Sequence, residues 1–487
     1  MSAPRSLARF LEVLEERGEL CRIEEEVDPC LEVTALAEPV MKAGGPALVF
    51  SRIKGHTVPL AINLFGSRRR MSLALGVEDL EEVAGRLRDL LAVEIPQGGL
   101  WAKLAGALPK LKELSAFAPR VVRRAPCQEV VRQGEEASLE LLPVLTCWPE
   151  DAGPFITLPQ VITADPDSGR QNAGMYRMQV FDSRTTGMHW HRHKGGAAHY
   201  ERAKALGQRL PVAVALGGPP AAVYAACAPL PPVMDELMFT GFLLGEPVEV
   251  VRCRTCDLLV PARAEVVLEG YVDPAEPLRR EGPFGDHTGY YSLADDYPVF
   301  HLTAITHRRD LVYPTTVVGT PPMEDYWLGL ATERIFLPLL QMVLPEVVDL
   351  HMPPEGVFHN LVFVAIDKRY PGQAYKVMHA LWGQGQMMFA KVIVVVDADV
   401  DVHDPQRAWW EALNHLDPAR DLIISRGPAD ALDHAAARPW LHGKLGIDGT
   451  RKLPEEGAER PWPRRIEMTP ELRRAALQRL RRWGLLD

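Results

Sequence analysis

The sequence lacks the short motifs that identify several large enzyme classes. It contains no G-x-G-x-x-G, no Walker A loop, no G-x-S-x-G and no H-E-x-x-H. These motifs bind dinucleotides, cradle phosphates, present a serine nucleophile or hold zinc. Nicotinamide dehydrogenases, P-loop enzymes and serine hydrolases are therefore disfavoured, and the chemistry has to be sought in less regular groups of residues.

Long apolar runs are also missing. No stretch approaches the ~18 apolar residues that a membrane-spanning helix needs. The first residues, MSAPRSLARFLEVLEERGEL, have the charges and spacing of an amphipathic helix and not those of a signal peptide. We therefore expect a cytoplasmic protein, with at most peripheral contact with the inner face of a membrane.

Cysteine is scarce and irregularly spaced. The chain has seven cysteines, an odd number, so they do not indicate a disulfide framework. Cys253 and Cys256 form a single C-x-x-C without a second pair. They lie in the strand-like run VEVVRCRTCDLLVPA, where thiols usually serve as small core side chains. We favour that interpretation over a redox or zinc role.

An excess of basic residues is absent as well. There are 54 Lys and Arg against 64 Asp and Glu, with a net charge of −10, and the basic residues are dispersed. This argues against binding to nucleic acid. At 487 residues the chain is too long for one core, and we expect domains at residues 1–118, 119–318 and 319–455, followed by a linker and terminal helix at 456–487.

The pattern of predicted helices and strands differs between these segments. Helices alternate with strands in residues 1–118, which predicts an α/β domain. Short β-branched runs punctuated by Pro and Gly fill residues 119–318 and predict a barrel or sandwich. The strands VFHNLVFVAIDK, AKVIVVVDADVD and DLIISRG, with helices between them, predict a parallel βαβαβ unit. An Arg-rich amphipathic helix at 467–485 follows a Pro-rich linker, and we expect it to pack on a neighbouring subunit.

One stretch, RQNAGMYRMQVFDSRTTGMHWHRHKGG at residues 170–196, concentrates residues that carry chemistry. If it is a strand, His189, His191 and His193 share one face and suit zinc or manganese. The alternative is a solvated face without metal. Lys194 and the two glycines after it offer an ammonium and a close-approach backbone for a phosphate, or simply a turn.

Asn172 and Arg177 lie in the same stretch, five residues apart. An unbroken strand would point them to opposite faces, so a shared site requires a bend at Ala173-Gly174, which glycine permits. Arg177 stands among apolar residues and needs an anionic partner if it is buried. That partner is either a structural carboxylate or the carboxylate of a substrate.

Carboxylates occur in two further places. Glu281 and Asp286 flank a tight Pro- and Gly-containing loop in EGPFGDHTGYY, so that both acids can return to one side and transfer protons. The alternative is that Asp286 caps its own turn. Glu236 follows an Asp at a predicted helix start, where an acid is favoured by the helix dipole in any case.

Several blocks together resemble one known family. TCWPEDAGPFIT, QNAGMYRMQ, HRHKGGAAHY, EGPFGDHTGYY and GIDGT match, in order and spacing, the UbiD family of prenylated-flavin-dependent decarboxylases. The similarity extends from about Leu7 to Pro463. It implies a split β-barrel flavin domain between an N-terminal α/β domain and a C-terminal α/β oligomerisation domain with a terminal helix.

The resemblance also implies a set of site residues. Asn172, His193 and Glu236 correspond to the family's ligands for Mn²⁺, with K⁺ as a further candidate ion. Its catalytic acid–arginine–acid network corresponds to Arg177, Glu281 and Asp286. The positions that correspond to its contacts with prenylated FMN are Met175, Tyr176, Arg177, His189, Trp190, His191, Lys194 and Gly195.

The activity implied is the non-oxidative decarboxylation of an aromatic acid. Asp286 resembles the quinone-biosynthesis branch, which implies 4-hydroxy-3-polyprenylbenzoate or the carboxynaphthoquinol of menaquinone synthesis as substrate. A flavin prenyltransferase would supply the cofactor, and the protein would be a homo-oligomer, dimer or hexamer. The alternatives are a decarboxylase of a non-prenylated acid, an FMN-binding redox protein on the same barrel, and a metal-dependent hydrolase that uses the histidines.

Overall fold

The computed structural model describes residues 2–91, 115–191, 194–230, 234–457 and 460–486. Its N-terminal elements are α1 (Leu7–Glu16), β1 (Leu20–Val27), α2 (Glu32–Lys42), β2 (Ala47–Ile53), β3 (Leu60–Ile62), α3 (Arg68–Leu75) and α4 (Leu80–Leu91). The sheet order is β1-β2-β3-β20, so the short strand β20 (Tyr313–Pro314) joins this sheet from much later in the chain. Ser6 caps α1, and the apolar residues at helical spacing, such as Phe10 and Leu14, are buried as predicted.

The central part is built on a seven-stranded sheet in which every pairing is antiparallel. Its strands are β5 (Val130–Gln133), β7 (Pro159–Ala164), β8 (Gln171–Met175), β10 (Thr185–Gly187), β11 (Leu210–Leu216), β14 (Val266–Val272) and β19 (Val299–His307). The order is β10-β19-β14-β11-β7-β8, with β5 also paired to β19. The described strands thus form an open path and no closed ring, whereas the resemblance led us to expect a split barrel.

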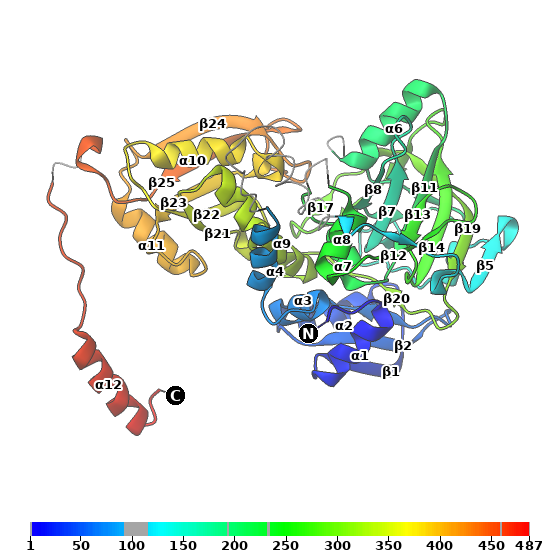
Figure 1. Cartoon of the computed structure of the whole chain (residues 1–487), viewed down its shortest axis with the longest axis horizontal. Helices are drawn as coiled ribbons and strands as arrows, with labels where there is room; N and C mark the ends of the chain where they lie inside the picture. Colours follow the sequence, from blue (N-terminus) through cyan, green and yellow to red (C-terminus); the bar gives the residue numbers. More distant parts are fainter. Residues whose placement is uncertain (1, 92–114, 192–193, 231–233, 458–459, 487) are drawn as a thin grey trace, which may run out of the picture.

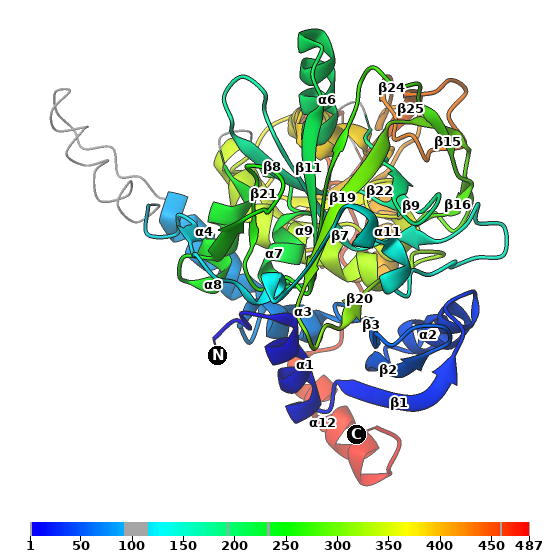
Figure 2. The same ribbon diagram turned by 90° about the vertical axis from the view of Figure 1, so that its right-hand side faces the viewer.

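Smaller elements surround this sheet. They are β4 (Arg120–Val121), β6 (Phe155–Ile156), β9 (Met178–Gln179), α6 (Gly195–Leu206), α7 (Pro220–Ala225), α8 (Glu236–Leu244), β12 (Glu249–Arg252), β13 (Leu259–Pro261), β15 (Arg279–Glu281), β16 (Phe284–Gly285), β17 (Tyr291–Ser292) and β18 (Asp295–Tyr297). Figures 1 and 2 show α6 at one end of the sheet and the N-terminal elements at the other. Three short two-stranded antiparallel pairings, β6–β9, β15–β18 and β16–β17, position the loops of the site described below.

The C-terminal part contains a five-stranded sheet in the order β21-β22-β23-β25-β24. Its elements are α9 (Glu324–Val343), β21 (Val347–His351), β22 (Leu361–Ile366), α10 (Gln373–Trp382), β23 (Val392–Asp397), α11 (Pro405–His415), β24 (Leu422–Pro428) and β25 (Leu441–Asp448). The central strands β22, β23 and β25 are parallel, whereas β21 and β24 pair antiparallel at the edges.

The predicted parallel βαβαβ unit is therefore wrong in its last strand. The run DLIISRG forms the edge strand β24, and β25 takes the third parallel position. The chain returns from β24 to β25 through residues 429–440 without a crossover helix, and such a connection joins antiparallel neighbours. The residues of β24 alternate between partly buried and exposed, which is typical of an edge strand, whereas those of β23 are buried almost without interruption.

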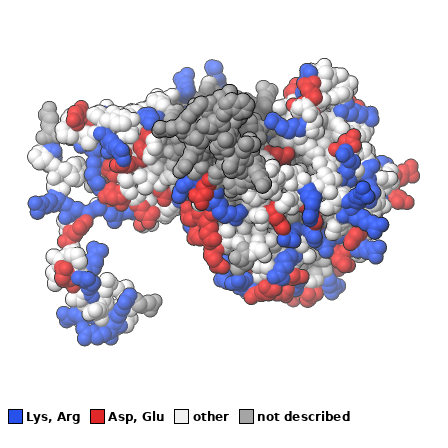
Figure 3. Space-filling view, viewed as in Figure 1, with Lys and Arg blue, Asp and Glu red and all other residues white. Residues whose placement is uncertain are grey.

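Helices α4 and α9 pack along each other and connect the N-terminal elements with the C-terminal sheet. The last helix, α12 (Pro470–Arg482), stands away from the rest of the molecule at the end of an extended segment (Figure 1). Basic side chains are spread over the face seen in Figure 3 among acidic ones and form no continuous patch on its described residues. In the described part of the chain, no helix is long and apolar enough to cross a membrane.

Candidate functional site

A cavity of about 500 Å³ lies where the central sheet, the start of α9 and the C-terminal sheet meet. One wall comes from β8 and the loops after it, and the opposite wall from residues such as Phe358, His359 and Asp430. The residues of the predicted site that line this cavity are Asn172, Met175, Tyr176, Arg177, His189, His191, Lys194, Gly195, Glu236 and Asp286. Trp190 and Glu281 are buried without lining it, and His193 lies outside the described residues.

Arg177 is the charged centre of this cavity. Its Nε lies 3.1 Å from Oε1 of Glu281, and a terminal nitrogen pairs with Oδ2 of Asp286. The other terminal nitrogen donates to the hydroxyl of Ser292 at 3.0 Å, and the guanidinium lies 4.7 Å from the centroid of the Phe284 ring. The structure thus brings together the two acids and the arginine that the sequence separates by about a hundred residues.

Asp286 is bonded on both of its oxygens. His287 donates to Oδ1 from its backbone N–H at 2.8 Å and from ring Nδ1 at 2.9 Å, while Arg177 holds Oδ2. Burial would raise the pKa of Asp286, but the charges of Arg177 and His287 outweigh it and hold that pKa well below its usual value. Burial alone would lower the pKa of His287, but the hydrogen bond to Asp286 and the charge of Asp286 raise it above its usual value. In the free protein Asp286 is therefore a carboxylate.

Glu281 serves Arg177 and His189 with the same oxygen. His189 Nδ1 lies 2.7 Å from Oε1 of Glu281, and His189 Nε2 lies 2.7 Å from Nε2 of His191. Burial, followed by the charge of Arg177, lowers the pKa of His189, so the ring is neutral. Because its proton is then on Nδ1, its Nε2 accepts a hydrogen bond from His191. The second oxygen of Glu281 is buried without a hydrogen-bond partner in the described structure.

His189 and His191 do not lie on a strand, so the one-faced arrangement expected for a strand does not hold for these two residues. Strand β10 ends at Gly187, and His189 and His191 lie in an irregular segment after it. The chain turns there, because the Trp190 N–H donates to the carbonyl of Met188. His189 and His191 still meet, but they do so across a turn and not at the period-two spacing of a strand.

The bend that brings Asn172 and Arg177 to one cavity also differs from the prediction. Ala173 and Gly174 remain in β8, where they pair with β7. The strand instead stops after Met175, and the chain re-enters a strand at β9. Arg177 lies in this gap, so its side chain is free of the alternation that β8 imposes on Asn172.

Asn172 and Glu236 form a second polar group in the cavity. Asn172 Nδ2 donates to Oε1 of Glu236 at 2.7 Å, and the backbone N–H of Ala173 donates to Oε2 at 3.1 Å. Glu236 is the first residue of α8, whose start is capped by Asp235. Burial raises the pKa of Glu236, and Asn172 Oδ1 is buried with no hydrogen-bond partner in the described part of the chain. An amide oxygen and a carboxylate placed in this way fit a hard divalent cation such as Mn²⁺.

The start of α6 provides a place for a phosphate beside this pair. Lys194 precedes the helix and is mostly buried, which lowers its pKa. A Cβ on Gly195 would come within 2.5 Å of Asn172 Oδ1, so only glycine leaves this approach open. Backbone N–H groups at a helix start and a nearby ammonium favour an anion. The residues present therefore fit a phosphate group next to a divalent cation: Lys194 and the start of α6 would hold the phosphate, and Asn172 and Glu236 would hold the cation.

Sequence reasoning missed part of the cavity wall. His287 stood in the quoted block beside Asp286 and could have been chosen for its ring. Asp325, whose pKa burial raises to about 6, lies at the start of α9. His359 and Asp430 come from loops of the C-terminal part that contain no recognisable motif. These residues can be recognised as part of the cavity wall only from the way two distant parts of the chain pack together.

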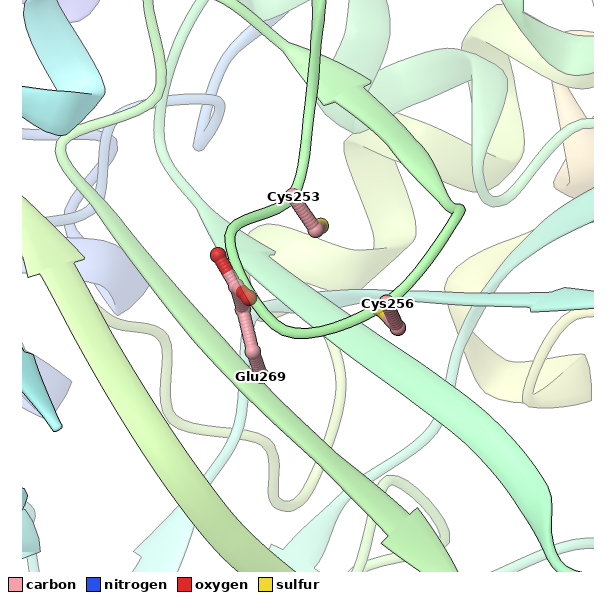
Figure 4. A group of neighbouring side chains, drawn as sticks. All are labelled: Cys253, Cys256 and Glu269. Carbon is pink, nitrogen blue, oxygen red and sulfur yellow. The ribbon is translucent and has the colours of Figure 1, made fainter. Parts of the chain in front are cut away.

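The C-x-x-C lies away from this cavity, in the loop between β12 and β13 (Figure 4). Glu269 on β14 points its carboxylate at the loop and accepts the N–H groups of Arg254 at 2.9 Å and Thr255 at 2.6 Å. Cys253 and Cys256 belong to an apolar group of buried and partly buried side chains, and the described cysteines form no disulfide. The carboxylate thus has its partners in the turn, in agreement with the interpretation of these thiols as core side chains.

Comparison with known proteins gives a consistent result over nearly the whole chain. Residues 11–87, 120–321 and 326–449 match the models of the N-terminal, Rift-related and C-terminal domains of 3-octaprenyl-4-hydroxybenzoate carboxy-lyase (UbiD). An uncharacterised protein of Archaeoglobus fulgidus is 53% identical over 474 residues, which are 97% of each chain.

Solved structures of the same class superpose on the fold. The UbiD-class enzyme HmfF of Pelotomaculum thermopropionicum, in complex with FMN, is 31% identical with a TM-score of 0.80, and 97% of this chain and 99% of that chain are covered. The closed form of vanillic acid decarboxylase from Sedimentibacter hydroxybenzoicus is 29% identical with a TM-score of 0.84, and 99% of both chains is covered. With three domain models matched in order, the chain belongs to the UbiD family of carboxy-lyases.

Proposed function

We propose that the protein decarboxylates an aromatic carboxylic acid without net oxidation, using prenylated FMN and Mn²⁺ held in the cavity between the central and C-terminal parts. The observation that carries the proposal is the placement of Arg177, clamped by Glu281 and Asp286, in the same cavity as the Asn172–Glu236 pair. One group suits a carboxylate substrate and the other a metal-bound phosphate. Both are present in a single site of a UbiD-family chain.

The cofactor is needed because the electron pair of the broken carbon–carboxylate bond requires an acceptor. Loss of CO₂ from an aromatic ring leaves an electron pair in the plane of the ring, where the π system cannot accept it. Prenylated FMN supplies an electrophilic acceptor for these electrons when it is bound. Asn172, Glu236 and His193 would hold Mn²⁺. Lys194 and the start of α6 would hold the phosphate. HmfF, which is similar in structure, was solved in complex with FMN, and an evolved dimeric form of HmfF was solved in complex with prFMN.

Arg177 orients the substrate in this proposal. Its guanidinium already binds two carboxylates, and a substrate carboxylate replaces Asp286 as a partner because Asp286 lines the cavity. Glu281 does not line the cavity and stays behind the guanidinium, where it also holds His189. Phe284 packs on the guanidinium and helps to exclude water, which favours the release of neutral CO₂.

The proton that replaces CO₂ comes from Asp286. Substrate binding removes Arg177 from its carboxylate and adds a negative charge nearby, and both changes raise the pKa of Asp286. His287 is bonded to Asp286 through Nδ1 and has a raised pKa, so it can pass its proton to the carboxylate. The overall change is ArCOO⁻ + H⁺ → ArH + CO₂, which balances in atoms and charge.

The substrate class follows from the branch that Asp286 resembles. We propose a quinone precursor, either 4-hydroxy-3-polyprenylbenzoate or the carboxynaphthoquinol of menaquinone synthesis. A small non-prenylated aromatic acid is the second candidate, because vanillic acid decarboxylase is a close structural relative and the cavity of about 500 Å³ must hold the cofactor as well. The proposal includes a cytoplasmic location and a flavin prenyltransferase as cofactor supplier.

The test is production of the protein together with a flavin prenyltransferase, followed by absorbance and mass measurement of the bound cofactor. The loaded protein is then incubated anaerobically with prenylated hydroxybenzoates, the carboxynaphthoquinol and small hydroxybenzoates, and CO₂ release is measured. We expect prenylated FMN at about one per chain and turnover of at least one acid class. Unmodified FMN that NAD(P)H reduces reversibly, without CO₂ release, would replace the proposal with the redox-protein alternative. Activity that survives complete removal of flavin would instead favour the metal-dependent hydrolase.

A further inference from the structure

A group of charged and histidine side chains lies outside the cavity, where α9, β21 and the loop after β23 meet. Three of them, Glu333, His351 and His403, are of a type and spacing that could hold a metal ion, and Arg334 and Asp349 contact them; we call these five residues the α9 cluster. Glu333 is on α9, Asp349 and His351 are on β21, and His403 precedes α11. The side chains of Glu333 and His351 are almost completely buried, whereas about a third of the His403 side chain is exposed. Neither the family resemblance nor the proposed reaction uses these residues.

The spacing within the α9 cluster fits ligands around one ion. His351 Nδ1 lies 3.2 and 3.1 Å from the two oxygens of Glu333, and His403 Nδ1 lies 4.0 Å from Glu333 Oε1. Zinc binds nitrogen and oxygen at about 2.0–2.2 Å, so two ligands at a tetrahedral angle lie roughly 3.4 Å apart. The two imidazole rings, with centroids 4.7 Å apart, approach the carboxylate from different elements. Small side-chain movements would place all three ligand atoms on a common centre.

Asp349 makes the case stronger than proximity alone. Its Oδ2 lies 3.1 Å from Nε2 of His403, which fixes the proton of a neutral ring on Nε2 and leaves the Nδ1 lone pair directed toward Glu333. A carboxylate that accepts the outer N–H of a ligating histidine is the usual second layer of a zinc site. Glu333 is similarly held from outside, because Oε2 accepts the N–H of Met352 at 2.7 Å.

The charge balance of the α9 cluster is also suitable. Glu333 and Asp349 contribute two negative charges, and Arg334, within 3.1 Å of Glu333 and 2.8 Å of Asp349, contributes one positive charge. With neutral histidines, the cluster has a net charge of −1 before an ion binds. A divalent cation compensates this charge in a buried setting, and Arg334 keeps the outer carboxylate in place.

We propose that the α9 cluster binds one divalent cation of the zinc class, with Glu333, His351 and His403 as its three protein ligands. Two histidines and one glutamate leave a fourth position for water on the partly exposed side of His403. The ion joins α9 to β21, and both elements lead to the cavity. Asp325, in the first turn of α9, lines the cavity eight residues before Glu333, about 12 Å along the helix. The bound ion therefore braces the C-terminal wall of the cavity without touching the substrate.

The test uses full-length protein without cofactor, freed of metal by a chelator and titrated with Co²⁺. The variant Glu236→Gln provides the background, because it removes a ligand proposed for the cofactor-side metal. We expect this background to bind one Co²⁺ with visible absorption of a four- or five-coordinate site, which Zn²⁺ displaces. Adding His403→Ala should abolish this signal. Adding Asp349→Asn should weaken the affinity about 10–100-fold, as loss of an outer carboxylate does. His379→Ala, on the exposed face of α10, is the matched control and should bind as the background does.

A second readout is independent of Co²⁺. Zn²⁺ should raise the melting temperature of the Glu236→Gln protein and of its His379→Ala form, but not that of the His403→Ala form. If the Glu236→Gln protein binds no Co²⁺ and Zn²⁺ leaves its melting temperature unchanged, the α9 cluster is a hydrogen-bond network only and the proposal is wrong. That measurement needs no variant of the cluster itself, so it remains decisive even if His403→Ala fails to fold. It is also independent of decarboxylation and therefore of the proposed function.

Discussion

At the scale of single residues, Arg177 has the least replaceable chemistry. Its fork of N–H groups holds two carboxylates and a hydroxyl at once, and a lysine offers no comparable planar array. A buried arginine without these anions would carry an unpaired charge, so the two acids and the arginine stabilise one another in the folded chain. The same arrangement lets a substrate carboxylate enter by exchanging with Asp286, the acid on the cavity side.

Replacing Arg177 by Lys tests whether geometry or charge matters. Arg177→Lys keeps the positive charge but loses the planar fork, and Arg177→Ala loses both. If Arg177 orients the substrate, we expect decarboxylation to fall by about 10²–10³-fold in Arg177→Lys and further in Arg177→Ala, which is the size of effect for loss of an oriented charge contact. The assay is CO₂ release, with bound cofactor measured by absorbance. Turnover at the wild-type rate in either variant would remove Arg177 from the mechanism.

The pair of Asp286 and His287 makes the stability of the cofactor-free protein depend on pH. The folded pKa of His287 is raised, so its contribution is complete below an unfolded pKa of about 6.5 and is lost as pH rises through the folded value. The folded pKa of Asp286 is depressed, so its contribution is present above about 3.9 and is lost only as pH falls through the folded value. Both contributions are thus complete between these limits.

The variant His287→Gln should therefore melt at a lower temperature than the wild type at pH 5–6, and this difference should shrink above pH 7. Thermal melting followed by circular dichroism across this range measures it, with the exposed His379→Gln as control. A difference that does not change with pH would mean that His287 is uncharged in the folded protein, contrary to the proton relay proposed for Asp286.

At the scale of elements, the site depends on where strands and helices end. β8 brings Asn172 to the cavity, the gap after Met175 frees Arg177, and the first residue of α8 supplies Glu236. Sequence patterns predicted a helix at α8, whereas only the family resemblance implied that these three residues belong to one site. Sequence patterns could not predict the break after Met175, because strand pairing with β7, and not the local glycine, decides how far β8 extends. For the same reason, the alternating pattern of His189, His191 and His193 was compatible with a strand as long as the end of β10 was unknown.

The close approach of Gly195, at the start of α6, to Asn172 gives a test of the cofactor site. Gly195→Ala places a methyl group 2.5 Å from Asn172 Oδ1, so Asn172 must move away from Glu236. We expect flavin affinity to fall at least tenfold, or about 1.4 kcal/mol, measured by fluorescence titration. The matched control is Gly85→Ala in α4, where a Cβ meets nothing within 4 Å. That change should leave flavin binding intact and stabilise the fold by about 0.5–1 kcal/mol. Equal flavin affinity in both variants would contradict the proposal that Lys194 and the start of α6 bind the phosphate.

At the scale of the whole molecule, the cavity is a product of two parts of the chain. The loops and helix around the central sheet supply the charged wall of Arg177, Asp286 and Glu236, and loops of the C-terminal part supply Phe358, His359 and Asp430. Family resemblance located the charged wall well, because its residues stand in contiguous blocks. The opposite wall comes from loops without such blocks, and β24 was misassigned for a related reason: sequence does not show whether a strand returns directly or through a crossover.

The terminal helix leads to the last prediction, which concerns assembly. Every residue of α12 is at least partly exposed, and α12 and its flanking residues expose large apolar side chains, including 67% of Met468, 60% of Leu472 and 61% of Trp483. A helix of 13 residues is marginal in water by itself. Its apolar face therefore needs another surface, and we propose that this surface belongs to a second copy of the chain.

Removal of residues 467–487 should consequently lower the mass of the assembly measured by light scattering, while the isolated subunits keep the circular dichroism of the fold. The reason is that the deletion takes away apolar contact area between copies but no residue of the described cavity lining or strands. As a control, Arg473→Gln and Arg474→Gln lower the charge of α12 and leave its apolar residues in place, so the assembly should persist. An unchanged mass after the deletion would show that α12 covers its own chain in solution, and the interface would then have to be sought on the C-terminal sheet.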